Sequence, residues 1–391
     1  MAKIPKVALL IENSRTYGRE LLRGIARYNR FYGPWSFYME PPFYLESGGR
    51  IRQLDVSHLK QLEPDGIIMR DTEKPEEIAS MGIPTIIASA IKGPMPGIPT
   101  ICTNDARMGK MAAEHLLERG LRHFGYCGFD DMSWSQKRSD SFVKSVKKAG
   151  FQTSVYQQPK SRAARVWESE QSLVAQWLKS LPKPVGLMVC NDDRGRQIIE
   201  TCNAEGLKAP DEVAVIGVDN DNLVCELSNP PLSSIALNVE RAGYEAAELL
   251  SKLMRGREKM AGQEIRVEPV HIVTRQSTDI LAIEDPVVSE ALKFIRQHAK
   301  ENIFVADVVK AVPTSRRSLQ GRFLKVLHRS VQDEIARVRA EMVAQLLVET
   351  NLSISEICVR LEYGGPEHIS RSFKRAKGIS PRVFRRRYGH K

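Results

Sequence analysis

Basic side chains with the chemistry to contact nucleic acid recur at helical spacing near the end of the chain. Arg371, Lys374 and Arg375 are spaced i, i+3, i+4, so on a helix they share one face, opposite Phe373. Arginine can bind guanine through two hydrogen bonds, and lysine neutralises phosphate. The spacing therefore predicts a helix that contacts DNA, although a solvated charged face is the competing interpretation.

An earlier segment repeats this pattern. Residues 316–327, RRSLQGRFLKVL, predict a helix with basic side chains outward and apolar ones inward. Glutamine on such a helix can pair with adenine. The predicted DNA-contacting side chains are Arg316, Arg317, Gln320 and Arg322, and the predicted inward ones are Leu319, Phe323 and Leu327.

Two pairs of short helices joined by one long helix would position these side chains. Asp285 before a proline marks a helix start, Ser315 can cap the next helix of the series, and Ser353 forms a capping box with Glu356. A last short turn is predicted at 380–381. Each pair has the organisation of a helix-turn-helix, whose second helix enters the major groove. The long helix is predicted from an apolar stripe of Ile335, Val338, Met342 and Leu346.

The charge distribution agrees with a separate basic domain. The 106 residues from Pro286 onward carry 21 Lys and Arg against 10 Asp and Glu, whereas the first 285 residues carry 37 of each. The net charge of +11 therefore lies in the C-terminal part, as in a nucleic-acid-binding module, or in a solubilising tail.

The C-terminal motifs resemble one family. The run ISEICVRLEY…HISRSFKRAKGISPRVFR has the I-x-x-I, R-x-F-K, G-x-S-P and F-R elements of the AraC family of bacterial transcription regulators, and SRRSLQGRF…ARVRAEMVAQLL is similar to it as well. The resemblance implies that two recognition helices enter successive major grooves of operator DNA. Pro313 and Glu362 stand where the family usually has glycine. By position, the base-contacting residues would be Arg317, Gln320, Glu367, His368, Ser370 and Arg371.

The preceding residues alternate short apolar runs with amphipathic stretches. Examples are KVALLI before GRELLRGIARYNRF, and VGLMVC before DDRGRQIIETCNAEG. This alternation predicts βαβ units and parallel sheets, arranged as two consecutive α/β layers. The predicted fold class is a two-lobed α/β sensor over 4–280, followed by an all-α domain with two helix-turn-helix motifs over 281–391.

The sequence lacks the motifs of several other classes of protein. No G-x-G-x-x-G or G-x-x-x-x-G-K-[ST] sequence follows a strand, no zinc spacing joins the six cysteines, and no run approaches ~18 apolar residues. We expect no cofactor, no metal, no membrane span, and reduced, buried thiols. The short apolar run at the start lacks a cleavage site and is not a signal peptide, so a cytoplasmic location is expected.

The N-terminal region resembles the LacI and periplasmic sugar-binding fold. The segments AEHLLERGLRHFGYCG, VCNDDRGRQII and VAVIGVDND match landmarks of that group, and YGRELLRG, GVDN, RQSTD and DPVV…HA are similar to enteric regulators that join both parts in one chain and respond to xylose. The resemblance implies a homodimeric activator that binds a monosaccharide, D-xylose being favoured, and works with RNA polymerase. A different monosaccharide, a sugar phosphate, or repression remain alternatives.

Polar side chains at strand ends are the candidate sugar ligands. Carboxylate, amide and guanidinium groups can bind sugar hydroxyls, and an aromatic ring can cover an apolar sugar face. Asp105 and Asp192 could instead only cap helices. Tyr17 and Trp134 could instead pack between the two lobes. Asn238 lies one residue beyond the expected position and is left out. By matching position, the candidates are Tyr17, Arg19, Asp105, Trp134, Arg138, Asn191, Asp192 and Asp219.

An enzyme is the competing functional class. The sequence contains carboxylates, but it has no histidine metal motif, no G-x-S-x-G and no Pro-Cys-His setting for an alkyl-acceptor cysteine. The sequence therefore predicts a sugar-responsive DNA-binding regulator with no catalytic residues.

Overall fold

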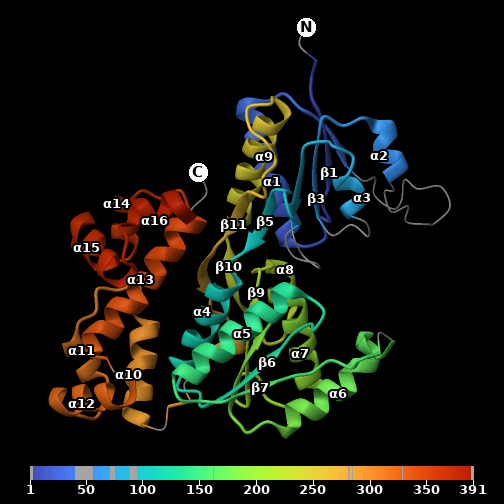
Figure 1. The fold of residues 1–391 in the computed structure, drawn as a ribbon. Helices are drawn as coiled ribbons and strands as arrows, with labels where there is room; N and C mark the ends of the chain where they lie inside the picture. Colours follow the sequence, from blue (N-terminus) through green and yellow to red (C-terminus); the bar gives the residue numbers. More distant parts are fainter. Residues whose placement is uncertain are drawn as a thin grey trace. The chain divides into compact units, whose positions relative to one another are not determined.

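Each of two β-sheets is assembled from segments that are not consecutive in the chain (Figure 1). The computed structural model describes residues 3–39, 56–70, 75–88, 95–161, 163–280, 282–283, 285–327 and 329–388. The chain divides into two compact units. The first comprises residues 1–107, 128–140 and 237–269, and the second comprises 108–127, 141–236 and 270–391.

The first unit contains a six-stranded sheet of order β11-β5-β4-β3-β1-β2, in which all neighbouring pairs are parallel. Helices α1 (Thr16–Tyr32) and α9 (Val239–Met254) pack closely because glycine lies at both contacts. A Cβ on Gly24 would lie 1.9 Å from the carbonyl oxygen of Glu240, and one on Gly243 would lie 2.1 Å from that of Leu21. The strands are β1 (Lys6–Leu10), β2 (Ser36–Met39), β3 (Gly66–Arg70), β4 (Thr85–Ala88), β5 (Thr100–Thr103) and β11 (Glu264–Val267), and the short helices are α2 (Val56–Leu62) and α3 (Pro75–Ala79).

The second unit contains a sheet of order β12-β10-β9-β8-β6-β7. Its central strands are buried along their whole length, which explains their continuous apolar sequences. Its strands are β6 (His123–Cys127), β7 (Thr153–Val155), β8 (Val185–Val189), β9 (Val213–Val218), β10 (Ser233–Leu237) and β12 (Pro269–Val273). Helices α4 (Asp105–Leu117) and α5 (Ser133–Lys148) begin in the first unit and end in the second. The other helices of the second unit's α/β part are α6 (Trp167–Ser180), α7 (Asp192–Ala204) and α8 (Asn222–Leu227), with 3-10 turns at Ala163–Arg165 and Gln276–Thr278.

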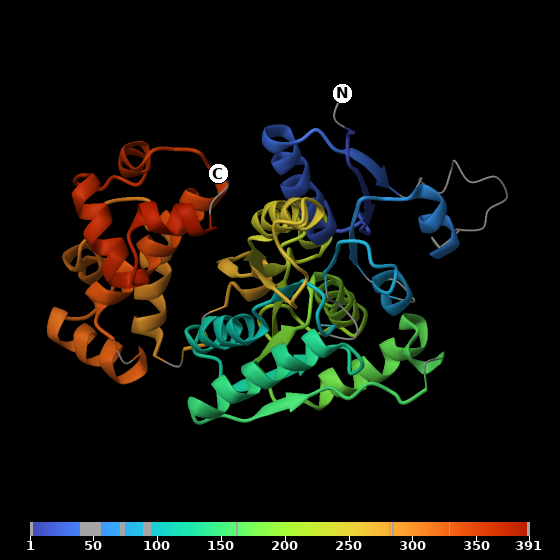
Figure 2. The same cartoon turned by 45° about the horizontal axis from the view of Figure 1, so that its top comes forward.

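The last part of the second unit is entirely helical (orange and red in Figure 2). It has two apolar cores, one around Phe323 and one around Phe373. Helix α13 contributes to both cores, so it joins the two helix-turn-helix motifs into one body. The helices are α10 (Pro286–Gln297), α11 (Val305–Lys310), α12 (Arg316–Leu327), α13 (Val331–Glu349), α14 (Ile354–Arg360), α15 (Pro366–Lys377) and α16 (Pro381–Tyr388).

The predicted fold class is confirmed, and so are the predicted helix starts. Asp285 Oδ1 accepts hydrogen bonds from the N–H groups of residues 287 and 288, Ser315 Oγ accepts one from residue 318, and Ser353 and Glu356 form the capping box. The six cysteines are free thiols, five of them buried. The predicted domain boundary adjoins residue 281, which lies outside the described residues.

Three predictions about the elements were wrong. The α/β layers are not consecutive, because α9 and β11 return to the first sheet before β12 joins the second. The predicted turn after residue 380 is the helix α16. Along α13, Ile335 is buried but Val338, Met342 and Leu346 are only partly so, since the helix turns different faces toward its two cores. The buried residues of its second half are Ala340, Val343, Ala344 and Leu347.

Candidate functional sites

Three candidate sugar ligands of the first unit are in contact. Nε of Arg138 donates a hydrogen bond of 2.9 Å to Oδ1 of Asp105, and its guanidinium lies 4.7 Å from the ring centre of Trp134. Asp105 and Arg138 are 6% and 4% exposed. Oδ1 of Asp105 also accepts from the hydroxyl of Thr103, at 2.7 Å. The carboxylate therefore holds a buried guanidinium beside a half-buried indole ring, a combination that suits both the hydroxyls and the apolar face of a sugar.

Tyr17 and Arg19 lie near the start of α1. The guanidinium of Arg70, at the end of β3, lies 4.5 Å from the ring centre of Tyr17. Arg19 donates to the carbonyl oxygens of Asn13 and Ser14, at 3.2 and 2.7 Å, so its side chain secures the loop between β1 and α1. Sequence reasoning missed Arg70, although its place at a strand end was the signal that could have found it.

In the second unit, Asn191 and Asp192 have different roles. Asn191 is the N-cap of α7 and accepts a hydrogen bond from the N–H of Arg194, at 3.0 Å. Asp192 is 2% exposed, and its two oxygens accept from the hydroxyl of Ser234, at 2.5 Å, and from the N–H of Asp221, at 2.8 Å. Burial, followed by the nearby charge of Asp219, raises the pKa of Asp192 well above its ordinary value. The capping role proposed for Asp192 thus belongs to Asn191.

Asp219 follows β9 in a backbone conformation that side chains rarely adopt. Its φ is +105°, and that of Asn220 is +51°. The N–H of Asn220 donates to Ser234 Oγ, which in turn donates to Asp192. Oδ1 of Asn220 is buried and lacks a hydrogen-bond partner in the described structure. Two consecutive residues at positive φ beside an unsatisfied polar atom are typical of a ligand site. Sequence reasoning missed Asn220 and Ser234.

Asn238, which is not among the candidate ligands, forms hydrogen bonds within the first unit. Its Oδ1 accepts from the N–H of Glu268, and the carboxylate of Glu268 accepts from the amide of Asn104 and from Arg107. These contacts join the ends of β5 and β11 in the first unit.

On the first helix-turn-helix, the second helix is α12. Arg316 and Arg317 are exposed and Gln320 is half-buried, while Leu319 and Phe323 are buried as predicted. Arg322 differs from its neighbours, because it bonds both carboxylate oxygens of Asp285 at 2.8 and 3.0 Å. That ion pair ties α12 to the start of α10 and gives Arg322 a structural role in place of the predicted DNA contact.

On the second helix-turn-helix, α15 exposes most of the predicted side chains. Ser370 is partly buried and its hydroxyl donates to the carbonyl of Pro366, at 2.8 Å. Arg371 and Arg375 also line a groove of about 360 Å³ beside α13. Arg339, missed by sequence reasoning, lines this groove and stacks on Tyr363, its guanidinium 4.1 Å from the ring centre. The exposed side chains are Glu367, His368, Arg371, Lys374 and Arg375.

The turn before α15 keeps a left-handed residue. Glu362 has φ +48°, the conformation for which the AraC family usually uses glycine. Pro313 differs, since its ring restricts φ to negative values. Within the described ranges, no three His, Cys, Asp or Glu side chains group as metal ligands, and no helix is long and apolar enough to cross a membrane.

Comparison with known proteins identifies the two domain types of this architecture. Residues 113–278 match the periplasmic binding protein-like domain, and residues 308–387 match a helix-turn-helix domain. The fold and the two candidate sites thus define a transcription regulator that joins a sugar-binding type of sensor domain to an AraC-type DNA-binding domain. The chain is 30% identical to the xylose operon regulatory protein of Haemophilus influenzae, over 97% of this chain and 98% of that one, and 30% identical to that of Escherichia coli K12, over 97% and 96%.

The chain belongs to the family of the xylose operon regulatory proteins. A solved structure, that of the xylose-binding transcription activator XylR, covers 100% of both chains with a TM-score of 0.60 and 28% identity. A LacI family regulator from Enterococcus faecium with bound ribose shares the fold over 70% of this chain and 98% of its own, with 20% identity and a TM-score of 0.54. The relatives are regulators rather than enzymes, so the enzymatic alternative is excluded.

Proposed function

We propose that this regulator is a xylose-dependent activator of sugar-catabolism genes. The observation that carries the proposal is the similarity over nearly the whole chain to regulators named for the xylose operon, and to a xylose-binding activator. Activation, rather than repression, rests on that similarity alone.

The proposed sugar ligands form two groups, one in each unit. Arg138 and Asp105 of the first unit bring a paired guanidinium and carboxylate, and Trp134 brings an aromatic face. Asp192 and Asp219 of the second unit bring carboxylates. A neutral monosaccharide suits this set better than a sugar phosphate, because the first 285 residues carry no net charge. Tyr17, Arg19 and Asn191 remain in the proposed set by position, with Arg70 and Asn220 added on structural grounds.

The first experiment is calorimetric titration of the full chain with D-xylose, L-arabinose, D-ribose and D-glucose. We expect saturable binding of D-xylose alone, reduced at least tenfold in Asp219→Ala, because a buried sugar hydroxyl would lose its acceptor. Asp211→Ala is the control, because Asp211 is exposed and precedes β9 whereas Asp219 follows it, at the other end of the strand. Binding of another sugar would identify that sugar as the effector instead. If none of the four titrations released or absorbed heat, none of these monosaccharides would be the effector.

The proposed macromolecular partners are operator DNA, a second copy of the chain and RNA polymerase. We propose that the regulator acts as a homodimer in the cytoplasm, where its operator lies. The proposed DNA contacts are Arg316, Arg317, Gln320, Glu367, His368, Ser370, Arg371, Lys374 and Arg375. Ser370 reaches DNA in this proposal only if its hydroxyl leaves the carbonyl of Pro366.

A further inference from the structure

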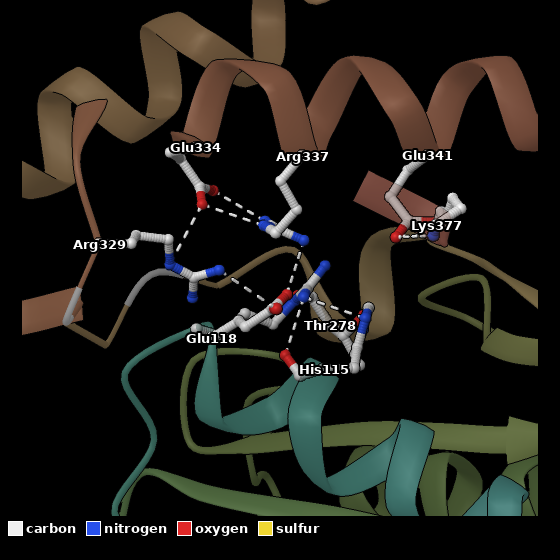
Figure 3. Close-up of polar contacts among 9 residues, drawn as sticks. His115, Glu118, Thr278, Arg329, Glu334, Arg337, Glu341 and Lys377 are labelled. Carbon is white, nitrogen blue, oxygen red and sulfur yellow. Dashed lines mark hydrogen bonds and ion pairs between the residues drawn. The ribbon is translucent and has the colours of Figure 1, made fainter. Parts of the chain in front are cut away.

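Within the second unit, a cluster of charged side chains lies between the end of α4 and the long helix α13 (Figure 3). Glu118, just after α4, lies between two arginines of the helical part. Its Oε2 is 2.7 Å from Nη1 of Arg337, and its Oε1 is 3.5 Å from Nη1 of Arg329. All three side chains are about three-quarters buried, at 24–25% exposure. We call these residues, with Glu334, the α4–α13 joint.

Glu334 completes the joint from the α13 side. It is 2% exposed, and its oxygens bond Arg337 at 2.7 and 3.0 Å while its Oε2 lies 3.5 Å from Arg329. Although burial opposes ionisation, the hydrogen bond and charge of Arg337 lower the pKa of Glu334. The two arginines are thus held between one carboxylate on their own helix and one on the sensor side. The bidentate geometry fixes the direction of the guanidinium toward Glu118.

Apolar and backbone contacts support the joint on both sides. The N–H of Ala282 donates to the carbonyl of Arg119, at 2.8 Å, and a Cβ on Gly120 would lie 2.6 Å from the side chain of Ile283. Val270 of β12 packs into the apolar core that contains Ala340 and Phe373. The sensor side is therefore tied to the helical part by contacts other than the ion pairs.

Hydrogen bonds, together with two steps between chain neighbours, lead from the joint to the proposed sugar ligands, because Arg119 follows Glu118 and Ser234 follows Ser233. His115 Nδ1 lies 3.1 Å from Nη1 of Arg119 and Nε2 lies 2.9 Å from Oγ1 of Thr278, whose hydroxyl donates to Ser233 at 2.7 Å. Ser234, the next residue of β10, donates to Asp192. In addition, α4 begins at Asp105, the partner of Arg138, and is followed directly by Glu118. The series through His115 and Thr278 and the helix α4 therefore both lead from proposed sugar ligands to the α4–α13 joint.

We propose that the α4–α13 joint is the element that couples sugar binding to DNA affinity, with Glu118 as its positioning residue. This inference rests on the proposed function. While Glu118 holds both arginines, the helix that joins the two DNA-binding motifs keeps one orientation relative to the sheet whose strands β8 and β9 precede Asp192 and Asp219. Without that carboxylate, the arginines remain paired with Glu334 but no longer tie α13 to α4.

The test compares Glu118→Gln with Glu341→Gln in the full chain. Glu341 also lies on α13 and forms an ion pair, but with Lys377 of α15, so it stays within the helical part (Figure 3). The measured quantity is the factor by which D-xylose changes affinity for operator DNA, typically about 5- to 150-fold in coupled systems. We expect Glu118→Gln to reduce this factor about fivefold with unchanged sugar affinity, and Glu341→Gln to keep it. An unchanged factor in Glu118→Gln overturns the proposal.

A second measurement tests the joint without sugar. We expect amide hydrogen exchange across residues 329–337 of the sugar-free chain to become at least fivefold faster in Glu118→Gln and in Arg337→Gln. The double variant should exchange no faster than either single variant. Exchange in Glu341→Gln should be unchanged. Additive acceleration in the double variant, or none in the single ones, overturns the joint. A native chain with no sugar effect on DNA affinity but with this exchange pattern would instead contradict the proposed function.

Discussion

Two aspartates that look alike in the sequence have different environments in the structure. Asp105 is paired with a guanidinium, whereas Asp192 accepts hydrogen bonds from a hydroxyl and a backbone N–H and faces a second carboxylate. Strand-end position predicted that both would lie at a site. The partners Arg138 and Ser234 are 33 and 42 residues away along the chain, so local pattern alone does not identify them.

Two basic residues of α15 are expected to differ in what they contribute to DNA binding. Arg371→Ala should relax sequence preference, because a bidentate contact to guanine is worth about 1–3 kcal/mol of discrimination. Lys374→Ala should weaken binding to every sequence and lower the salt slope by about 1, since it removes one phosphate contact. Binding to operator and random DNA over a salt series measures both quantities. Equal loss on all sequences for Arg371→Ala would reassign it to phosphate.

The elements were predicted best where burial is one-sided or complete. The strands of the second sheet and the capped helices α10, α12 and α14 follow from local sequence. The strands β2 and β5 were missed, since each has four residues and no alternation that distinguishes it from a loop. The predicted apolar stripe on α13 was wrong for a different reason, because a helix shared by two cores has no single apolar face.

The left-handed Glu362 allows a test at the scale of one turn. Glu362→Gly should stabilise the helical part by about 0.5–1 kcal/mol, because glycine adopts positive φ without the Cβ penalty, which exceeds its greater entropy loss on folding. Urea unfolding followed by circular dichroism measures the change. Glu362→Ala, which keeps the Cβ, should show no such gain. Equal stabilisation by both variants would place the effect in the glutamate side chain instead.

For the molecule as a whole, the clearest electrostatic feature is the buried His115. Burial, together with the charge of Arg119, lowers its pKa well below the ordinary 6.5. Arg119 itself, buried and near Arg296, has its pKa lowered to about 9. The acceptor role of His115 Nδ1 toward Arg119 requires a neutral ring, with the proton on Nε2 toward Thr278.

Acid should therefore destabilise the second unit through His115. Below pH 6.5 the unfolded chain binds a proton that the folded state does not, so the free energy of unfolding decreases as pH falls. We expect a loss of about 1 kcal/mol between pH 7.5 and 5.5 from this group. Urea unfolding at both pH values, in the native chain and in His115→Gln, measures it. His123, exposed at the start of β6, is the control as His123→Gln. A native-like pH dependence in His115→Gln would contradict the assignment.

The contacts of Glu118 also constrain how such regulators can be recombined. A chimera cut in the segment between the sensor and the helical domain would combine an acceptor carboxylate from one parent with arginines from another. Residue 118 lies more than 200 positions before Arg329, so a sequence boundary does not keep the pair together. Exchange of a DNA-binding domain between relatives consequently has to include the end of α4, and residues at these three positions are expected to change together as the family diverges.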